Sequence, residues 1–345
     1  LETTTLCAAG IIYHRHSKAT LEATWKYLFV CSTGIAIAYL GILLLSAAAS
    51  NNSLSYNDLQ QLIANGNPLY LKVAFLLIIT GYSCKMEIFP LYTIGVDANF
   101  AAPAPASAMI STGLVNAGFL AIFRIYKLFS TTEVFPWVKN VMLIIGLLSL
   151  MVGALFLRRT NNYKRFLSYS TVENMGIVAI GLGIGGIGVW AAIFHVVCHT
   201  FIKSSLFLQI AIVRQIYNGY RINRIGDYIN INKVGAIGLL LGMIAVLAFP
   251  PSPLFISELM IMMEALTLRG WWVLAIMVLL ICIVIFTVCH RMIKLCYQSN
   301  QDELHLSNIN RRLSYSALSL LVFALVIGFW QPTILRDIID KIAMF

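Results

Sequence analysis

Long apolar segments recur along this chain of 345 residues, and they constrain its fold more than any other feature. A helix needs about 20 predominantly apolar residues to cross the ~30 Å hydrocarbon core of a bilayer. Together with a shorter apolar stretch that begins at Leu1, these segments predict about ten membrane crossings. The segments are 27–49, 71–89, 106–126, 141–157, 166–186, 187–213, 235–266, 271–290 and 313–330.

The composition agrees with a membrane fold. Hydrophobic residues make up 59% of the chain and charged residues 11%, whereas soluble domains carry about 25% charged residues. The net charge of +10 does not indicate nucleic-acid binding, because the basic residues lie in short clusters between apolar segments, as they do in cytoplasmic loops. We therefore predict an all-α, polytopic bundle of membrane helices in the cell inner membrane, with the lipid bilayer and not nucleic acid as its partner.

The cysteines do not indicate a metal centre. No two of them form a CxxC pair, so neither a zinc site nor an iron–sulfur site is predicted, and no cofactor or metal is expected in this chain. Three of them, Cys282, Cys289 and Cys296, follow one another at intervals of seven residues, which is typical of small residues in helix packing. The seven cysteines are Cys7, Cys31, Cys84, Cys198, Cys282, Cys289 and Cys296.

Loop charge predicts the orientation of the chain. Loops 14–26, 158–165, 214–233 and 291–312 are rich in Lys and Arg, whereas loop 50–68 has neither. Positively charged loops stay on the cytoplasmic side, so we expect these four loops on that face and loop 50–68 on the other. The tail 331–345 alternates apolar and charged residues at helical spacing and is predicted to be an interfacial helix on the opposite face.

Two of the apolar segments contain or meet prolines, which predicts two broken transmembrane helices. Proline removes a backbone donor and frees carbonyl groups that lipid cannot satisfy, so such breaks are tolerated where they are buried or line a polar cavity. When each half of a transporter contains a broken helix, the two breaks indicate where its substrate or ion binds. The prolines are Pro90, Pro103 and Pro105 in the first case, and Pro250, Pro251 and Pro253 in the second.

A lysine lies deep in the segment before the first break. Lys85 is 14 residues after Leu71, the start of the run, or about 20 Å along a helix. A lysine at this depth is expensive to bury and can exchange a proton if it lines water. The alternative is that Lys85 extends its ammonium from the helix end toward the interface, helped by Glu87. Position alone favours neither interpretation.

The strongest constellation is His195, His199 and Lys203, at positions i, i+4 and i+8. One helix face therefore carries three proton-exchanging groups over roughly 12 Å. Histidine exchanges protons near neutral pH. A metal site is disfavoured, because the glutamate of an HExxH motif is missing and a lysine is adjacent. Buried histidines bonded to backbone carbonyls are a further alternative.

Acidic residues complete the candidate set. Glu258 follows the second break, whereas Glu264 is closer to Arg269 and is interpreted as an interface residue. Asp97 is predicted to cap or orient the connection after Pro90. Two more carboxyl groups, Glu2 in the opening stretch and Glu173 in STVENMG, lie within predicted helices.

Four stretches together resemble the antiporter-like membrane subunits shared by respiratory complex I, membrane-bound nickel–iron hydrogenases and multisubunit cation/proton antiporters. The proline-rich APAP stretch and the SxxExMG form are most similar to hydrogenase-4 component F. The resemblance implies antiporter-type inverted repeats. It also implies that the chain is N-terminally truncated by about four helices. The stretches are CKMEIFPLYTIGVDANFAAPAPASAMIS, YKRFLSYSTVENMG, FHVVCHTFIKSSLFL and FPPSPLFISELMI.

The resemblance also implies roles for individual residues. Glu2 matches the acid that pairs with the broken-helix lysine, which is Lys85 here. Lys203 matches the central lysine of the second half-channel, with His195 and His199 as its approach. Glu258 matches the terminal proton-exchanging group beside the second break. Where some complex I subunits have a lysine, this chain has Asn116, so water must bridge Lys85 to the second half.

These expectations describe one transmembrane proton-channel domain over 1–345. Residues 1–126 are the remainder of the first half-channel, 139–330 the second, and 331–345 the tail. We expect a non-catalytic, proton-translocating subunit of a hydrogenase-4-like or NADH dehydrogenase-like complex, with nickel–iron and iron–sulfur centres in partner subunits. The proton relay is Glu2, Lys85, His195, His199, Lys203 and Glu258, supported by Asn116, Asp97 and Glu173. The alternatives are a sodium/proton antiporter subunit and a membrane subunit of a bicarbonate-uptake complex.

Overall fold

The computed structural model describes residues 1–48, 55–298 and 311–343, and within these ranges the chain is helical without a β-strand. Short 3₁₀ turns η1 (Tyr13–Arg15), η2 (Ile63–Asn65) and η4 (Ile222–Arg224) and a π-helical segment η3 (Ile110–Leu114) join or extend some of the α-helices. The α-helices are α1 Glu2–Ile12, α2 Lys18–Ala48, α3 Tyr56–Leu62, α4 Pro68–Met86, α5 Thr93–Ala101, α6 Ala104–Met109, α7 Val115–Phe129, α8 Phe135–Arg159, α9 Tyr163–Ile184, α10 Ile187–Tyr217, α11 Tyr228–Ile231, α12 Lys233–Val246, α13 Pro253–Leu268, α14 Trp271–Tyr297, α15 Arg311–Trp330 and α16 Thr333–Ala343.

Seven helices in the described part of the chain are long and apolar enough to cross a membrane, which confirms the polytopic all-α fold. They are α2, α4, the continuous α6–α7 unit, α8, α10, α14 and α15. The expected count of about ten is higher for three physical reasons. The opening stretch is α1, which has 11 residues and is too short to cross. The predicted segment 166–186 is α9, whose first half is rich in polar residues, and segment 235–266 is divided between α12 and α13.

Both proline clusters coincide with helix ends. Helix α4 ends at Met86, and Pro90 lies in the connection to α5. Helix α12 ends at Val246, and Pro250 lies in the turn before α13. The Ser252 hydroxyl accepts a hydrogen bond from the Leu254 amide and so caps α13. That each pair of helices forms one interrupted span, with inverted repeats relating the two halves, stays a prediction.

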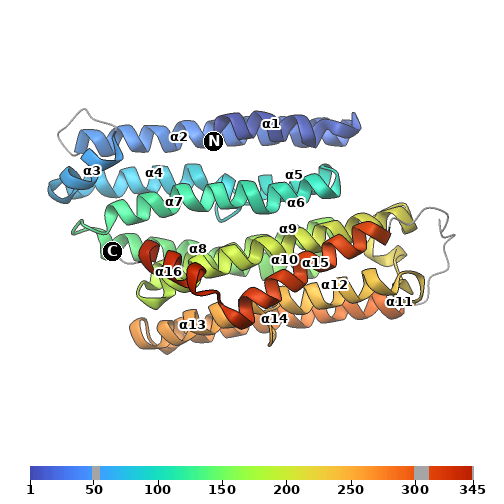
Figure 1. Cartoon of the computed structure of the whole chain (residues 1–345). Coiled ribbons are helices and arrows are strands. Elements are labelled where there is room, and N and C mark those ends of the chain that lie inside the picture. Colours follow the sequence, from blue (N-terminus) through green and yellow to red (C-terminus); the bar gives the residue numbers. More distant parts are fainter. Residues whose placement is uncertain (49–54, 299–310, 344–345) are drawn as a thin grey trace.

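The helices lie side by side, and α10 is central among them. In Figure 1, α1 and α2 run along one flank, α4 to α7 lie next to them, and α8 to α15 form the larger remaining part. Helix α10 contacts α9, α12, α13 and α15, and it also contacts α6. The side chains on α10 are therefore enclosed from several directions, which places this helix at the centre of any internal pathway.

Helices α8 and α9 approach each other unusually closely. A Cβ added at Gly146 of α8 would lie 2.6 Å from the Ile180 backbone nitrogen of α9. One added at Gly153 would lie 2.9 Å from the Cα of Glu173 and 2.6 Å from its Cβ. Real side chains do not approach this closely, so glycine at these positions allows the two backbones to touch. Helix α8 therefore packs directly against α9 and supports it.

The basic loops meet at one end of the bundle, as loop charge predicts. The Tyr163 amide donates to the Tyr220 carbonyl at 2.9 Å and the Ile222 amide to the Asn161 carbonyl at 3.0 Å, which ties loop 158–165 to loop 214–233. The Arg291 guanidinium donates to the Arg158 carbonyl at 3.1 Å. Helices α3 and α16 lie at the opposite end (Figure 1). Residues 50–54 and 299–310 of the predicted loops lie outside the described residues.

Which membrane side the basic end faces is a testable prediction. In a cysteine-free background, Asn161→Cys at the basic end and Thr131→Cys in the α7–α8 connection should react with a membrane-impermeant maleimide from opposite sides of sealed vesicles. We expect Asn161→Cys to react from the cytoplasmic side, because Lys- and Arg-rich loops are retained there. Permeabilised vesicles, in which both sites should react, provide the control. Reaction of both sites from the same side would contradict the arrangement.

Candidate functional site

Lys203 lies at the centre of the bundle. Its side chain, on α10, is completely buried, and its ammonium donates a hydrogen bond to the Leu167 carbonyl of α9 at 2.8 Å. Two buried carboxyl groups act on this ammonium electrostatically, Glu173 of α9 and Glu87 at the end of α4. Neither forms an ion pair with Lys203 in the part of the chain that the structure describes. The charge of Lys203 is thus balanced from two sides without a direct contact.

His195 and His199 share the buried face of α10 with Lys203, as the spacing predicts. The two rings are stacked with their centroids 6.3 Å apart. His195 shares hydrogen bonds with the Ser257 hydroxyl at 2.9 Å and the Asn174 side-chain oxygen at 3.1 Å, so its partners are side chains and not the backbone carbonyls of the structural alternative. Both ring nitrogens of His199 are buried without a hydrogen-bond partner among the described residues.

Two acidic residues lie against this face. Glu173 of α9 is buried and accepts a hydrogen bond from the Asn174 amide, the same side chain whose oxygen contacts His195. Glu258 of α13 is also buried, next to Ser257, and it interacts electrostatically with Glu173. Three helices therefore bring the predicted relay residues of the second half together. Glu173, which the sequence suggested only as a supporting residue, is at its centre.

The prediction of an ion pair between Glu2 and Lys85 is wrong, because the described residues contain no such pair. The Lys85 ammonium instead donates to the Thr5 hydroxyl at 2.7 Å and the Tyr27 hydroxyl at 3.1 Å, and it lies 4.9 Å from the centroid of the Tyr27 ring. Glu2 is exposed and accepts a hydrogen bond from Ser32 at 2.7 Å. The physical reason is helix phase, because α1 presents Thr5, one turn after Glu2, to α4. Lys85 is only 3% exposed, so it does not extend to the interface.

Glu87 is a functional candidate that the sequence interpretation missed. It follows α4 with a left-handed backbone (φ 58°), and its side chain lies against α5. Its Oε1 accepts a hydrogen bond from Asn99 at 3.0 Å, whereas its buried Oε2 has no partner among the described residues. Gly95 leaves room for the carboxyl group, since a Cβ there would lie 2.3 Å from it. The sequence feature that could have identified Glu87 is an acidic residue inside an apolar segment, shortly before Pro90.

Asp97 and Asn116 each connect two helices. Asp97 lies inside α5 and pairs with Arg165 of α9 at 3.1 Å, so it joins two helices and does not cap the connection after Pro90. Asn116 of α7 donates to the Thr200 hydroxyl of α10 at 2.7 Å, and its own side-chain oxygen is buried and unpartnered among the described residues. Asn116 therefore reaches α10 one turn from Lys203.

Several buried polar atoms on or near α10 have no hydrogen-bond partner among the described residues. Buried polar groups in proteins are nearly always hydrogen-bonded to protein or to ordered water. The atoms are Glu87 Oε2, Asn116 Oδ1, His199 Nδ1 and Nε2, and Ser205 Oγ. No group of three or more His, Cys, Asp or Glu side chains in the described ranges could hold a metal ion.

The chain is similar in sequence to known membrane proteins. The family described as "NADH:quinone oxidoreductase/Mrp antiporter, TM" matches residues 1–284. The hydrogenase-4 component F homolog of Methylacidiphilum infernorum is 29% identical over 272 residues, which are 77% of this chain and 57% of that protein. The chain thus spans a little over half the length of this relative.

Solved structures share the fold over nearly the whole chain. A chain of an archaeal membrane-bound sulfane sulfur reductase superimposes with a TM-score of 0.87 and 25% identity, covering 99% of this chain and 69% of that one. A chain of the Mrp complex from Dietzia sp. superimposes with a TM-score of 0.84 and 18% identity, covering 97% and 70%.

Proposed function

This chain belongs to the NADH:quinone oxidoreductase/Mrp antiporter family of membrane proteins, and we propose that it conducts protons through the bilayer as an antiporter-like subunit of a multisubunit redox complex. The observation that carries the proposal is the surroundings of Lys203. A fully buried lysine interacts electrostatically with two buried carboxyl groups and lies one helical turn from a buried histidine without a hydrogen-bond partner among the described residues. Ionisable residues inside membrane segments are costly to bury and mark ion and proton paths.

The electrostatics of the site suggest how a proton moves. While Glu173 and Glu87 are ionised, they stabilise the Lys203 ammonium. A proton that reaches Glu173 neutralises part of this field, so the ammonium loses compensation and tends to release its own proton. His199, one turn away on the same helix face, can accept that proton directly or through one water. Glu258, which interacts electrostatically with Glu173, and the hydrogen bonds of His195 to Asn174 and Ser257 continue the path.

Glu87 fills the gap in the first half of the path. Lys85 faces α1 and α2, and Asn116 cannot carry a proton itself. Glu87 follows Lys85 by two residues and acts electrostatically on Lys203. We infer that protons pass from the Lys85 region, in half-channel 1–126, through Glu87 to Lys203 in half-channel 139–330. Glu2, which is exposed, joins this path through water.

The partners follow from the relatives. The relative and one of the structural neighbours carry hydrogenase and sulfane sulfur reductase names, both redox complexes. We infer that nickel–iron or iron–sulfur centres, where present, lie in other subunits, and that this chain supplies the membrane path without catalysing the redox step.

An antiporter role is the second candidate, favoured by the structural likeness to the Mrp complex. The lining of the site argues against sodium as the transported ion. Sodium and other hard cations prefer several oxygen ligands, whereas here a lysine ammonium and two imidazoles occupy the centre. No observation on the described residues favours the bicarbonate-uptake alternative.

Proton uptake in proteoliposomes tests the proposal. The complex, purified with its native partners and driven by its redox substrate, should acidify the vesicle lumen as measured by a pH-sensitive dye. The rate should be unchanged when choline replaces sodium, because the site contains groups that exchange protons. An uncoupler that collapses the signal is the control. Acidification that needs sodium would contradict the proposal and favour the antiporter.

A further inference from the structure

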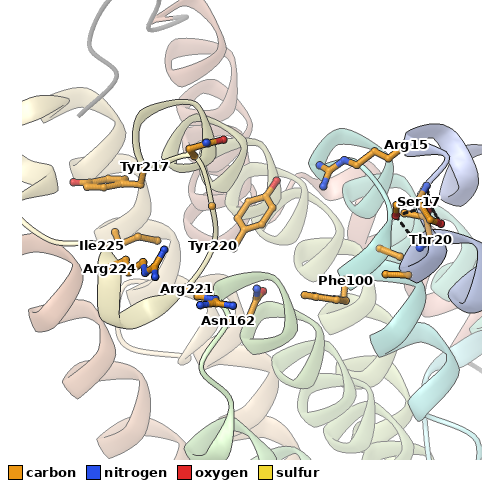
Figure 2. A pocket seen from close by; sticks show the side chains of 14 residues that line it. Arg15, Ser17, Thr20, Phe100, Asn162, Tyr217, Tyr220, Arg221, Arg224 and Ile225 are labelled. Atoms are coloured by element: carbon orange, nitrogen blue, oxygen red, sulfur yellow. Dashed lines mark hydrogen bonds between the residues drawn. The ribbon is translucent and has the colours of Figure 1, made fainter. Parts of the chain in front are cut away.

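A second feature lies far from Lys203, at the end of the bundle where the basic loops meet. Two cavities there, of about 340 and 740 Å³, share Phe100, Asn162, Arg221 and Arg224 in their walls. Arg15 also lines the smaller cavity, and Arg159 and Arg165 also line the larger. We refer to the two cavities with these five arginines as the arginine basin. In Figure 2, Arg15 reaches toward Tyr220 from the α1–α2 connection, while Arg221 lies beside Asn162.

The positive charge of the basin is poorly compensated. No acidic residue lines either cavity, and Arg165 is the one arginine of the five with a carboxylate partner among the described residues, Asp97. One guanidinium nitrogen of Arg15 and the Nε of Arg165 are buried without a hydrogen-bond partner in the same ranges. Buried donors of this kind need an acceptor, which an anion would supply.

The retention of basic loops on one membrane side explains the number of arginines but not their arrangement. Arg159, Arg221 and Arg224 are exposed to solvent, yet all five arginines line two adjoining cavities. The loops are also fixed. The Tyr163–Tyr220 and Ile222–Asn161 backbone hydrogen bonds hold Arg221 in place, and the Arg165 guanidinium lies 4.5 Å from the centroid of the Phe100 ring. The backbone that carries Arg221 and the side chain of Arg165 are therefore held in place without a ligand.

We propose that the arginine basin binds a phosphate-bearing anion of the kind presented by an anionic phospholipid headgroup. Guanidinium groups match phosphate oxygens with two parallel hydrogen bonds. The basin lies where α2 and α9 begin and α10 ends, which is the depth of lipid headgroups for helices that span the hydrocarbon core. Its larger cavity, about 740 Å³, lies within the usual range for ligand pockets and exceeds the needs of a single phosphate.

Lipid titration with a matched pair of variants tests this site. The full chain, in its complex and in nonionic detergent, is titrated with cardiolipin, phosphatidylcholine or inorganic pyrophosphate, and bound molecules are counted by native mass spectrometry. Wild type should bind cardiolipin much more tightly than phosphatidylcholine. Arg221→Gln with Arg224→Gln should weaken cardiolipin binding about thirtyfold, since each interfacial arginine contributes about 1 kcal/mol.

The control removes two basic residues from the opposite end, Arg124→Gln with Lys139→Gln, and should change cardiolipin binding less than about twofold. Arg221→Lys with Arg224→Lys keeps the charge but not the two-pronged geometry, so an intermediate loss supports the site even if the glutamine variant is unstable. Pyrophosphate that binds as tightly as cardiolipin, and loses affinity in the same variants, supports the phosphate site and assigns it to a soluble anion. Equal cardiolipin binding by wild type and the glutamine variant would overturn the proposal.

Discussion

Proteoliposomes that hold the Lys203→Met complex should take up protons at about one hundredth of the wild-type rate or less, because the central proton carrier is lost. Methionine nearly matches lysine in length and is apolar, so it fills the buried space that Lys203 occupies. The two carboxyl groups beside it lose their cation and are expected to take up protons instead of remaining charged. Assembly, measured as the amount of intact complex, should therefore change little.

Two further variants separate charge from proton exchange at this position. Lys203→Arg keeps the positive charge but should also fail, because arginine scarcely releases its proton. His199→Ala should slow uptake by no more than about tenfold, since water can replace one relay step. Lys139→Met, at the far end of α8, is the matched control and should pump normally. Normal uptake by assembled Lys203→Met complex would refute the relay and leave Lys203 as a structural cation.

Glu87→Gln should reduce proton uptake by about tenfold or more, because the substitution removes the carboxyl group that faces both the first half of the chain and Lys203. The amide keeps the shape of the side chain, and its oxygen can still accept the hydrogen bond from Asn99. Folding and assembly should therefore be preserved. Glu87→Asp keeps a carboxyl group on a shorter side chain and should restore part of the activity.

The control for Glu87 is Glu264→Gln, a partly exposed acid of α13 whose oxygen accepts a hydrogen bond from the Ile187 amide. This variant should retain the wild-type rate of proton uptake in the same vesicle assay. If Glu87→Gln complex pumps as fast as Glu264→Gln complex, the halves are connected by another route. The hydrogen-bonded pair of Asn116 and Thr200 would then be the next candidate.

Features that depend on one segment at a time could be predicted from the sequence. Apolar length predicted the long helices, proline chemistry predicted where helices end near Pro90 and Pro250, and loop charge predicted that loops 158–165 and 214–233 share one end. The shared face of His195, His199 and Lys203 was also correct, because their spacing lies within one helix and follows from 3.6 residues per turn.

Features that depend on the rotation of one helix against another could not be predicted. Glu2 and Thr5 differ by about 60° around α1, and packing decided that Thr5 meets Lys85. The left-handed backbone of Glu87 carries its carboxyl group to Asn99 of α5, and nothing in the local sequence required that turn. Glu173 gained its central place because α9 packs between α8 and α10. Such contacts arise from packing between distant segments, which helix periodicity does not encode.

The close contact between α8 and α9 limits the conformational changes that this protein can undergo. Where the backbones touch at Gly146 and Gly153, a sliding motion of one turn would force each helix over the ridges of the other, and packed interiors resist such deformation. Glu173 is attached to this rigid wall at the point of contact. If the chain conducts protons as proposed, we expect α8 and α9 to stay fixed relative to each other while charge moves past Glu173. Energy would then be transmitted along the membrane as a sequence of small electrostatic changes, while α8 and α9 stay in place and do not slide.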